Sequence, residues 1–133
     1  MQNLRGWIGA RLAGWILLFG LALLAVMHIL ILVNAMPADF VWGGAITSRS
    51  QLYLLETLAL LIVALFAWIV ARRVGIIGTG HPGRGIRMGA WVVFAYMTLN
   101  ILGNLASGAS LERLLFAPFT VVLALLALRV AIE

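Results

Sequence analysis

Four long apolar runs follow one another along the chain, at residues 12–34, 50–71, 88–107 and 111–131, with short polar breaks between them. Each run has about 20 residues, and at roughly 1.5 Å of rise per residue a helix of that length spans a hydrocarbon core of about 30 Å. The first run is longer than the apolar region of a signal peptide, about 7–15 residues, so we expect it to be retained. The pattern predicts an all-α, polytopic membrane protein in which residues 1–133 form one domain, an antiparallel bundle of four transmembrane helices.

The first and third breaks carry residues that turns and helix starts favour. In the first, NAMPADFVWGGAITSRS, a proline, an aspartate and a glycine pair favour turns. Ser48 and Gln51 have the spacing of a capping box, which predicts that the second helix begins near Ser48. The third break, ASGAS, is so short that the third and fourth helices must be antiparallel neighbours, with Ser110 as N-cap and Glu112 in the first turn.

The middle break, RRVGIIGTGHPGRGIRMG, is rich in glycine and arginine and invites comparison with phosphate-binding loops. No strand pattern precedes it, and it has neither the dinucleotide-binding nor the P-loop spacing. We therefore interpret it as a flexible basic connection. Contact with anionic lipid headgroups is the alternative role.

Charge in this chain indicates topology rather than binding. Only 10% of the residues are charged and 65% are hydrophobic, whereas a soluble domain carries about 25% charge. The net charge of +5 would suit a nucleic acid, but the arginines lie at the ends of apolar runs, so we predict no nucleic-acid partner. With the N-terminus inside, two arginines fall outside, Arg49 and Arg113, and seven fall on the cytoplasmic side: Arg5, Arg11, Arg72, Arg73, Arg84, Arg87 and Arg129. This positive-inside bias predicts that both termini are cytoplasmic, and we expect the bacterial inner (plasma) membrane and its lipids as the surroundings.

Small residues and the lack of cysteine bear on partners and cofactors. Gly6, Ala10 and Gly14 recur every four residues, and Gly103 pairs with Ser107 at the same spacing, which lets helix backbones approach closely in lipid. Such contacts form either within the bundle or between subunits, so we expect a homo-oligomer or a complex with other membrane protein subunits. The chain has no cysteine, which excludes disulfides, thiolate catalysis and cysteine metal sites. We predict no metal and no cofactor.

Polar side chains within the runs gather at a similar depth. Measured from the middle of each run toward the outside, His28 and Glu56 lie roughly 7 Å up, Asn100 roughly 4 Å and Asn104 roughly 10 Å. Tyr96, Asn100 and Asn104 are spaced i, i+4, i+8 and therefore share one stripe of the third helix. Ionisable groups inside the membrane are costly and mark functional sites. The sequence therefore predicts a polar site in the outer half of the bundle, with these five residues as candidate ligand- or proton-binding groups.

The chemistry of these groups is complementary. Burial disfavours the charged forms of both Glu56 and His28, so together they can share a proton or form an ion pair. The amides and the phenol of the third helix would then satisfy the remaining hydrogen bonds. In an alternative, a protonated Glu56 donates to the carbonyl group that Pro118 leaves without a helical partner. Trp42 and Asp39, in the first break, are candidate lid residues.

Three functions and one structural role fit these residues. We expect first the binding or transport of a small ligand, ion or proton at the polar site. One alternative is an accessory or assembly subunit of a larger membrane complex, and another is an intramembrane acid–base enzyme of isomerase type that acts on a lipid or isoprenoid-like substrate. A non-enzymatic role is the one we expect, and the sequence assigns no catalytic residue. In the structural alternative, the polar cluster only sets the register of the helices.

Overall fold

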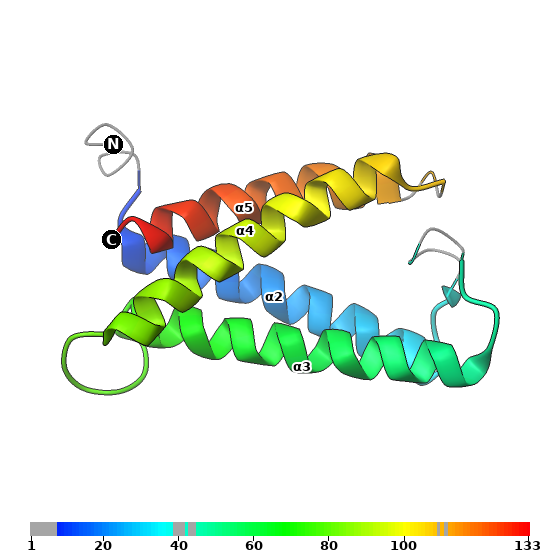
Figure 1. Ribbon diagram of the computed structural model, residues 1–133, viewed down its shortest axis with the longest axis horizontal. Coiled ribbons are helices and arrows are strands. Elements are labelled where there is room, and N and C mark those ends of the chain that lie inside the picture. The colour runs from blue at the N-terminus through cyan, green and yellow to red at the C-terminus, as the bar shows by residue number, and fades with distance from the viewer. Residues whose placement is uncertain (1–7, 39–41, 43–44, 109, 111) are drawn as a thin grey trace.

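The computed structural model describes residues 8–38, 42, 45–108, 110 and 112–133. Within them, four helical segments are long and apolar enough to cross a membrane, which confirms the predicted all-α bundle (Figure 1). The first three are α-helices and the fourth is a π-helical turn that continues as an α-helix: α2 Ala10–Leu32, α3 Arg49–Arg73, α4 Arg84–Ala106, η3 Glu112–Phe116 and α5 Ala117–Ala131. No strand occurs among the residues that the structure describes.

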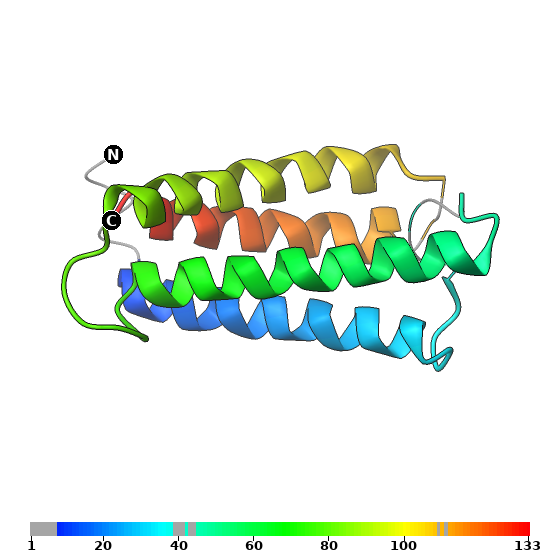
Figure 2. The same ribbon diagram turned by 60° about the horizontal axis from the view of Figure 1, so that its bottom comes forward.

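The segments form two antiparallel hairpins, α2 with α3 and α4 with α5, which pack on each other through α2 against α5 and α3 against α4 (Figures 1 and 2). The predicted pairing of the third and fourth helices is thus confirmed. The start of α2, the end of α5 and the connection 74–83 lie at one end of the bundle (Figure 1). The hairpins diverge toward the other end, where α2 finishes and α3 begins; we call this the open end (Figure 1).

Two helix starts show how local sequence positions the bundle. Ser48 is the N-cap of α3, as predicted, and its side chain accepts a hydrogen bond from the Gln51 N–H at 3.2 Å. The Gln51 side chain accepts in return from the N–H of Thr47 at 3.2 Å, one residue earlier than in a capping box. α4 begins at Arg84 rather than near residue 88, because Gly83 is an extended N-cap and the polar first turn is helical although it is not apolar. An apolar run marks the membrane-facing part of a helix and misses its polar ends.

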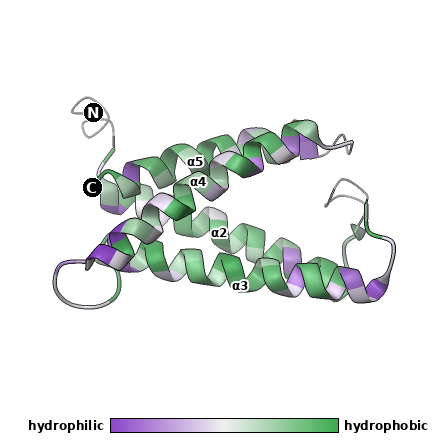
Figure 3. Cartoon of the chain, viewed as in Figure 1, coloured by the Kyte–Doolittle hydropathy of each residue, from purple (hydrophilic) through white to green (hydrophobic). Residues whose placement is uncertain are grey.

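Large apolar side chains cover the outside of the bundle. Each segment exposes some of them: Phe19 is 65% exposed, Leu54 69%, Leu102 61% and Leu114 74%. Figure 3 shows apolar residues along the helices and polar residues mainly near their ends and connections. Such a surface suits hydrocarbon rather than water. The buried core runs along the axis of the bundle and includes Leu17, Leu21, Val70, Val93, Met97 and Leu123.

Two glycines of α2 let neighbouring side chains pack closely inside the bundle. A Cβ atom added to Gly14 would lie 2.7 Å from a Val74 methyl group, and one added to Gly20 would overlap the side chain of Leu123 on α5. At Gly103, by contrast, an added Cβ atom would meet nothing within 4 Å among the described residues. The small-residue positions on α2 therefore serve packing within the subunit, and Gly6 of the predicted stripe lies outside the described residues.

Candidate functional site

The carboxylate of Glu56 is the most deeply buried charged group in the described chain, with 0% of the residue exposed. Its Oε2 atom lies 2.5 Å from His28 Nδ1, and its Oε1 atom accepts a hydrogen bond from the indole N–H of Trp42 at 2.6 Å. The indole can only donate, whereas the proton between Nδ1 and Oε2 belongs to one of those two atoms. The predicted partnership of Glu56 and His28 is thus present, and the pair is arranged to share a proton.

The helical hairpin and the connection after α2 bring these three side chains together. His28 stands one turn before the end of α2, and Glu56 lies two turns into α3, so antiparallel packing places them level. Asn34, just past the end of α2, has a φ of 56°, a left-handed conformation that asparagine tolerates and that turns the chain. Trp42 has a φ of 58°, which for a bulky residue costs on the order of 1 kcal/mol or more. Trp42 is also the residue whose indole N–H reaches Glu56.

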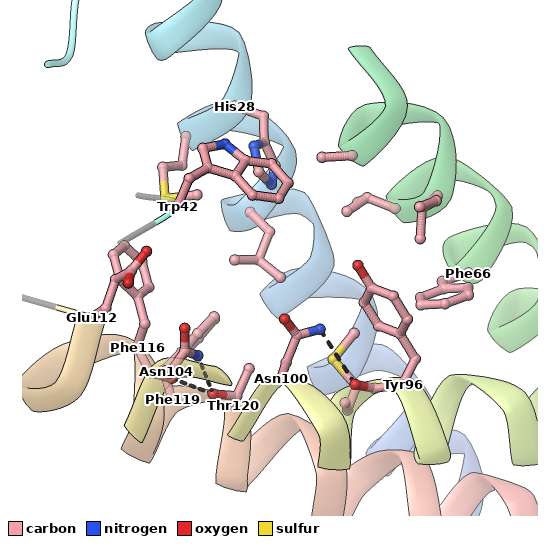
Figure 4. Close-up of a pocket in the computed structure, with 16 residues that line it drawn as sticks. His28, Trp42, Phe66, Tyr96, Asn100, Asn104, Glu112, Phe116, Phe119 and Thr120 are labelled. Atoms are coloured by element: carbon pink, nitrogen blue, oxygen red, sulfur yellow. Dashed lines mark hydrogen bonds between the residues drawn. The ribbon is translucent and has the colours of Figure 1, made fainter. Parts of the chain in front are cut away.

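A cavity of about 150 Å³ lies beside this pair, between the two hairpins at the open end. His28 and Trp42 form part of its wall (Figure 4). Glu56, to which both are hydrogen-bonded, does not line the cavity. Trp42 thus lines the cavity and contacts Glu56, and its role as a lid stays a prediction. Asp39, the other candidate lid residue, lies outside the described residues.

The polar residues of α4 face the same cavity but do not complete the bonds of Glu56. The Asn100 amide donates to the backbone oxygen of Tyr96 at 3.3 Å, and the Asn104 amide donates to the Thr120 hydroxyl at 2.9 Å (Figure 4). Tyr96 lines the cavity, with its ring edge-on to that of Phe66 at a centroid distance of 5.0 Å. The expectation that these side chains satisfy Glu56 is corrected: the Trp42 indole takes that role, because it lies within reach and α4 does not.

The fourth span also lacks the alternative arrangement, in which Glu56 donates to the carbonyl group that Pro118 leaves without a helical partner. The π-helical turn ends at Phe116, two residues before Pro118. Single π-helical turns are frequent at functional sites. The Thr120 hydroxyl donates to the carbonyl oxygens of Phe116 and Ala117, the second at 3.1 Å. Both oxygens of Glu56 are taken by His28 and Trp42, so donation from Glu56 to this helix is not the arrangement found.

Sequence reasoning missed two polar groups of the cavity. Thr120 is 5% exposed and lines the wall; its signal was a hydroxyl two residues after the proline of an apolar run. Glu112 was assigned a place in the first turn of the fourth helix only, yet it is 7% exposed and also lines the cavity. The sequence cannot distinguish a helix-start role from a cavity role, because an acid in the first turn of a helix can serve either one.

Metal binding finds no support in the described residues, which contain no group of three or more His, Cys, Asp or Glu side chains placed to hold an ion. The arrangement is instead suited to moving or holding a proton. The His28 ring connects the cavity to a carboxylate that has no exposure of its own.

The fold and the site define a small four-helix membrane protein with a mainly apolar cavity, lined also by a few polar side chains, at one end of its bundle. A comparison of the chain with protein-family models, curated proteins and solved structures finds no match. The function therefore has to follow from the site alone.

Proposed function

We propose that this protein binds a small ligand in the cavity between its two hairpins and that the Glu56–His28 pair is the proton-titrated group of that site. The function is either the binding of this ligand or its transport coupled to a proton. The observation that carries the proposal is the position of the pair. The acid is fully buried, and the imidazole that lies 2.5 Å from it forms part of the cavity wall.

The cost of burying the acid supports a functional role. A charged side chain within a membrane costs about 3 kcal/mol or more, and such groups are retained mainly in ion, proton or substrate sites. A ligand in the cavity touches His28 and Trp42, the two groups that hold Glu56. Occupancy of the cavity and protonation of the pair therefore act on the same side chains, which is the condition for thermodynamic coupling between them.

The orientation and assembly follow from the same proposal. Most of the arginines among the described residues lie at the end of the bundle where α2 starts and α5 ends, which favours a cytoplasmic position for that end and puts the cavity in the outer half of the membrane. A single four-helix bundle offers one open end. Transport therefore requires a homo-oligomer, whose contacts would use the exposed apolar faces of the helices.

The test is a thermal-shift screen of the purified protein in detergent at pH 6 and pH 8. The screen uses cations, neutral molecules and anions about the size of benzene, because an apolar cavity of about 150 Å³ holds one such molecule. We expect at least one compound to stabilise the protein and to do so more strongly at one pH than at the other. A screen with no stabilising compound in any charge class would refute the proposed function.

Glu56→Gln tests the role of the proton. The introduced amide can still accept from Trp42 and can donate to the Nδ1 atom of a neutral His28, so the local structure should persist. We expect binding to remain and its pH dependence to disappear. The matched control is Glu133→Gln, which removes one negative charge from an exposed acid at the opposite end of the bundle and should leave the pH dependence unchanged. Unchanged pH dependence in Glu56→Gln would remove the pair from the mechanism.

A further inference from the structure

The imidazole ring of His28 presents one nitrogen to Glu56 and leaves the other one free. Nδ1 lies 2.5 Å from Glu56 Oε2, and within the described residues Nε2 has no hydrogen-bond partner. Nε2 is not sealed off, because Arg73 Nε is the one buried side-chain nitrogen or oxygen without a partner in the described chain. Since His28 lines the cavity, Nε2 is the ring nitrogen that a ligand or water can reach.

The short distance between His28 and Glu56 decides which proton the pair can exchange. Two lone pairs would repel each other at 2.5 Å, so a proton lies between Nδ1 and Oε2, whichever atom holds it. Glu56 Oε1 already accepts from the Trp42 indole, which leaves Nε2 as the place for a second proton. With that proton the pair is neutral and Nε2 donates. Without it the pair carries one negative charge and Nε2 accepts.

The remaining charges and apolar groups of the wall favour a neutral ligand. No arginine or lysine lies among the described lining residues, so an anion would find no opposite charge. For a cation, both oxygens of Glu56 are taken, and Glu112 already has an interaction partner. Most of the lining side chains are apolar, and they include aliphatic residues, methionines and aromatic rings. An uncharged, mainly apolar molecule therefore suits the cavity.

The polar groups of α4 offer a ligand the same hydrogen bonds whether the pair is neutral or charged. The Tyr96 hydroxyl extends from α4 into the cavity, has no partner in the described part of the chain, and can donate or accept (Figure 4). The Asn100 nitrogen donates to the backbone, which leaves the amide oxygen as an acceptor. The titratable groups that face this space are His28 on α2, Glu56 behind it on α3, Tyr96 on α4 and Glu112 on η3, and the described lining residues of α5 add none.

We infer that the proton exchanged at this site is held on His28 Nε2, and that the ligand is a neutral, mainly apolar molecule whose carbonyl oxygen accepts from that atom. The inference rests on the proposed function and adds the position of the proton and the class of ligand. A carbonyl group can only accept, so it bonds to Nε2–H and meets a lone pair once the proton is lost. Binding of a carbonyl compound is therefore coupled to the proton and strengthens as the pH falls.

Nitrogen-15 NMR of the histidine ring tests which atom holds the proton. The chain has two histidines, and His81 lies exposed in the connection 74–83 at the opposite end of the bundle, so His81→Gln leaves His28 as the single labelled ring. Protonated and bare imidazole nitrogens resonate far apart. Over the pH range in which histidine ordinarily titrates, we expect Nε2 to lose its proton while Nδ1 keeps a hydrogen-bonded signal. Loss of the proton from Nδ1 instead, or a ring that does not titrate, would overturn the inference.

Two probes of nearly equal shape test the class of ligand. Cyclohexanone has a carbonyl oxygen where methylenecyclohexane has a CH₂ group, and both are close to benzene in size, as the cavity requires. Their affinities for the full chain in detergent follow from the concentration dependence of thermal stabilisation. We expect the ketone to bind about fivefold more tightly below the titration of Nε2 than above it, which corresponds to one hydrogen bond. The hydrocarbon should show no such difference, and an equal pH effect on both probes would overturn the inference.

Glu56→Gln separates the histidine ring from its acid. The introduced amide donates to Nδ1, so the neutral ring holds its proton on Nε2 at either pH. The ketone should then bind at both pH values as tightly as it binds the unaltered protein at the lower one, whereas Glu133→Gln should keep the pH dependence. Tighter binding of the ketone at the higher pH would contradict the assignment of the proton. Binding of neither probe, with charged compounds stabilising the protein in the screen, would refute the class of ligand and leave the proposed function standing.

Discussion

Removal of the Glu56 carboxylate should destabilise the bundle, because the side chains that donate to it lose their acceptor. In Glu56→Ala, the His28 ring loses its partner where its side chain is only 12% exposed, and an unsatisfied buried donor costs about 1–3 kcal/mol. Trp42 is 38% exposed and can turn its N–H to water, so the loss of its hydrogen bond adds little to the destabilisation. The lost packing of the side chain adds about 1 kcal/mol, which brings the expected loss of unfolding free energy to about 2–4 kcal/mol.

Glu56→Gln isolates the hydrogen bonds from the charge. The amide oxygen can accept from Trp42 and the amide nitrogen can donate to a neutral His28 ring, so both contacts survive. Only the strengthening by charge is lost, and we expect a change of less than about 1 kcal/mol. The difference between the alanine and glutamine variants therefore measures what the two hydrogen bonds contribute.

Unfolding free energies are measured by titration of the detergent-solubilised protein with sodium dodecyl sulfate, followed by far-ultraviolet circular dichroism. Glu133→Gln is the control, because this residue lies at the opposite end of the bundle and the introduced amide oxygen can still accept from Arg129. Stability of Glu56→Ala within about 0.5 kcal/mol of the unaltered protein would refute the reasoning, since surface substitutions away from such features cause changes of that size. Equal losses in the alanine and glutamine variants would show that charge, and not hydrogen bonding, holds the site.

Two further predictions concern packing and topology. Gly20→Ala places a methyl group against α5 and should lower the unfolding free energy by about 1–3 kcal/mol, whereas Gly103→Ala meets open space and should be neutral or stabilising; equal effects in the same titration would contradict the close packing. The chain has no cysteine, so single cysteines at Thr79 and Gly108 can be labelled with a membrane-impermeant maleimide in intact cells. We expect labelling at position 108 and protection at position 79, and the reverse pattern would refute the proposed orientation.

Much of the fold could be predicted because it rests on length and polarity. A helix must be long enough to cross the hydrocarbon and must satisfy its own backbone, so the apolar runs predicted four spans and the short connection predicted the neighbours α4 and α5. Ser48 marked the start of α3 for an equally local reason, the hydrogen bond to the N–H of Gln51. The early start of α4 at Arg84 escaped prediction because polar helical turns leave no apolar signal.

The candidate site could likewise be predicted only in part. Depth along the helices, which follows from the rise per residue, placed His28 level with Glu56, and the structure brings them to 2.5 Å. Depth does not tell which way a helix is rotated or which neighbour a side chain reaches. Asn104 therefore pairs with Thr120 instead of joining Glu56, although it lies within the same half of the bundle.

The sequence by itself determined the class of protein, the spans, their antiparallel order and the presence of an acid that needs a partner, because these depend on composition, length and position along the chain. The tertiary structure alone decided that Trp42 completes the hydrogen bonds of Glu56 and that Glu112 and Thr120 line a shared cavity. Hydrogen bonds form only within about 3 Å, and that reach depends on helix rotation, on the π-helical turn before Pro118 and on the left-handed conformation of Trp42.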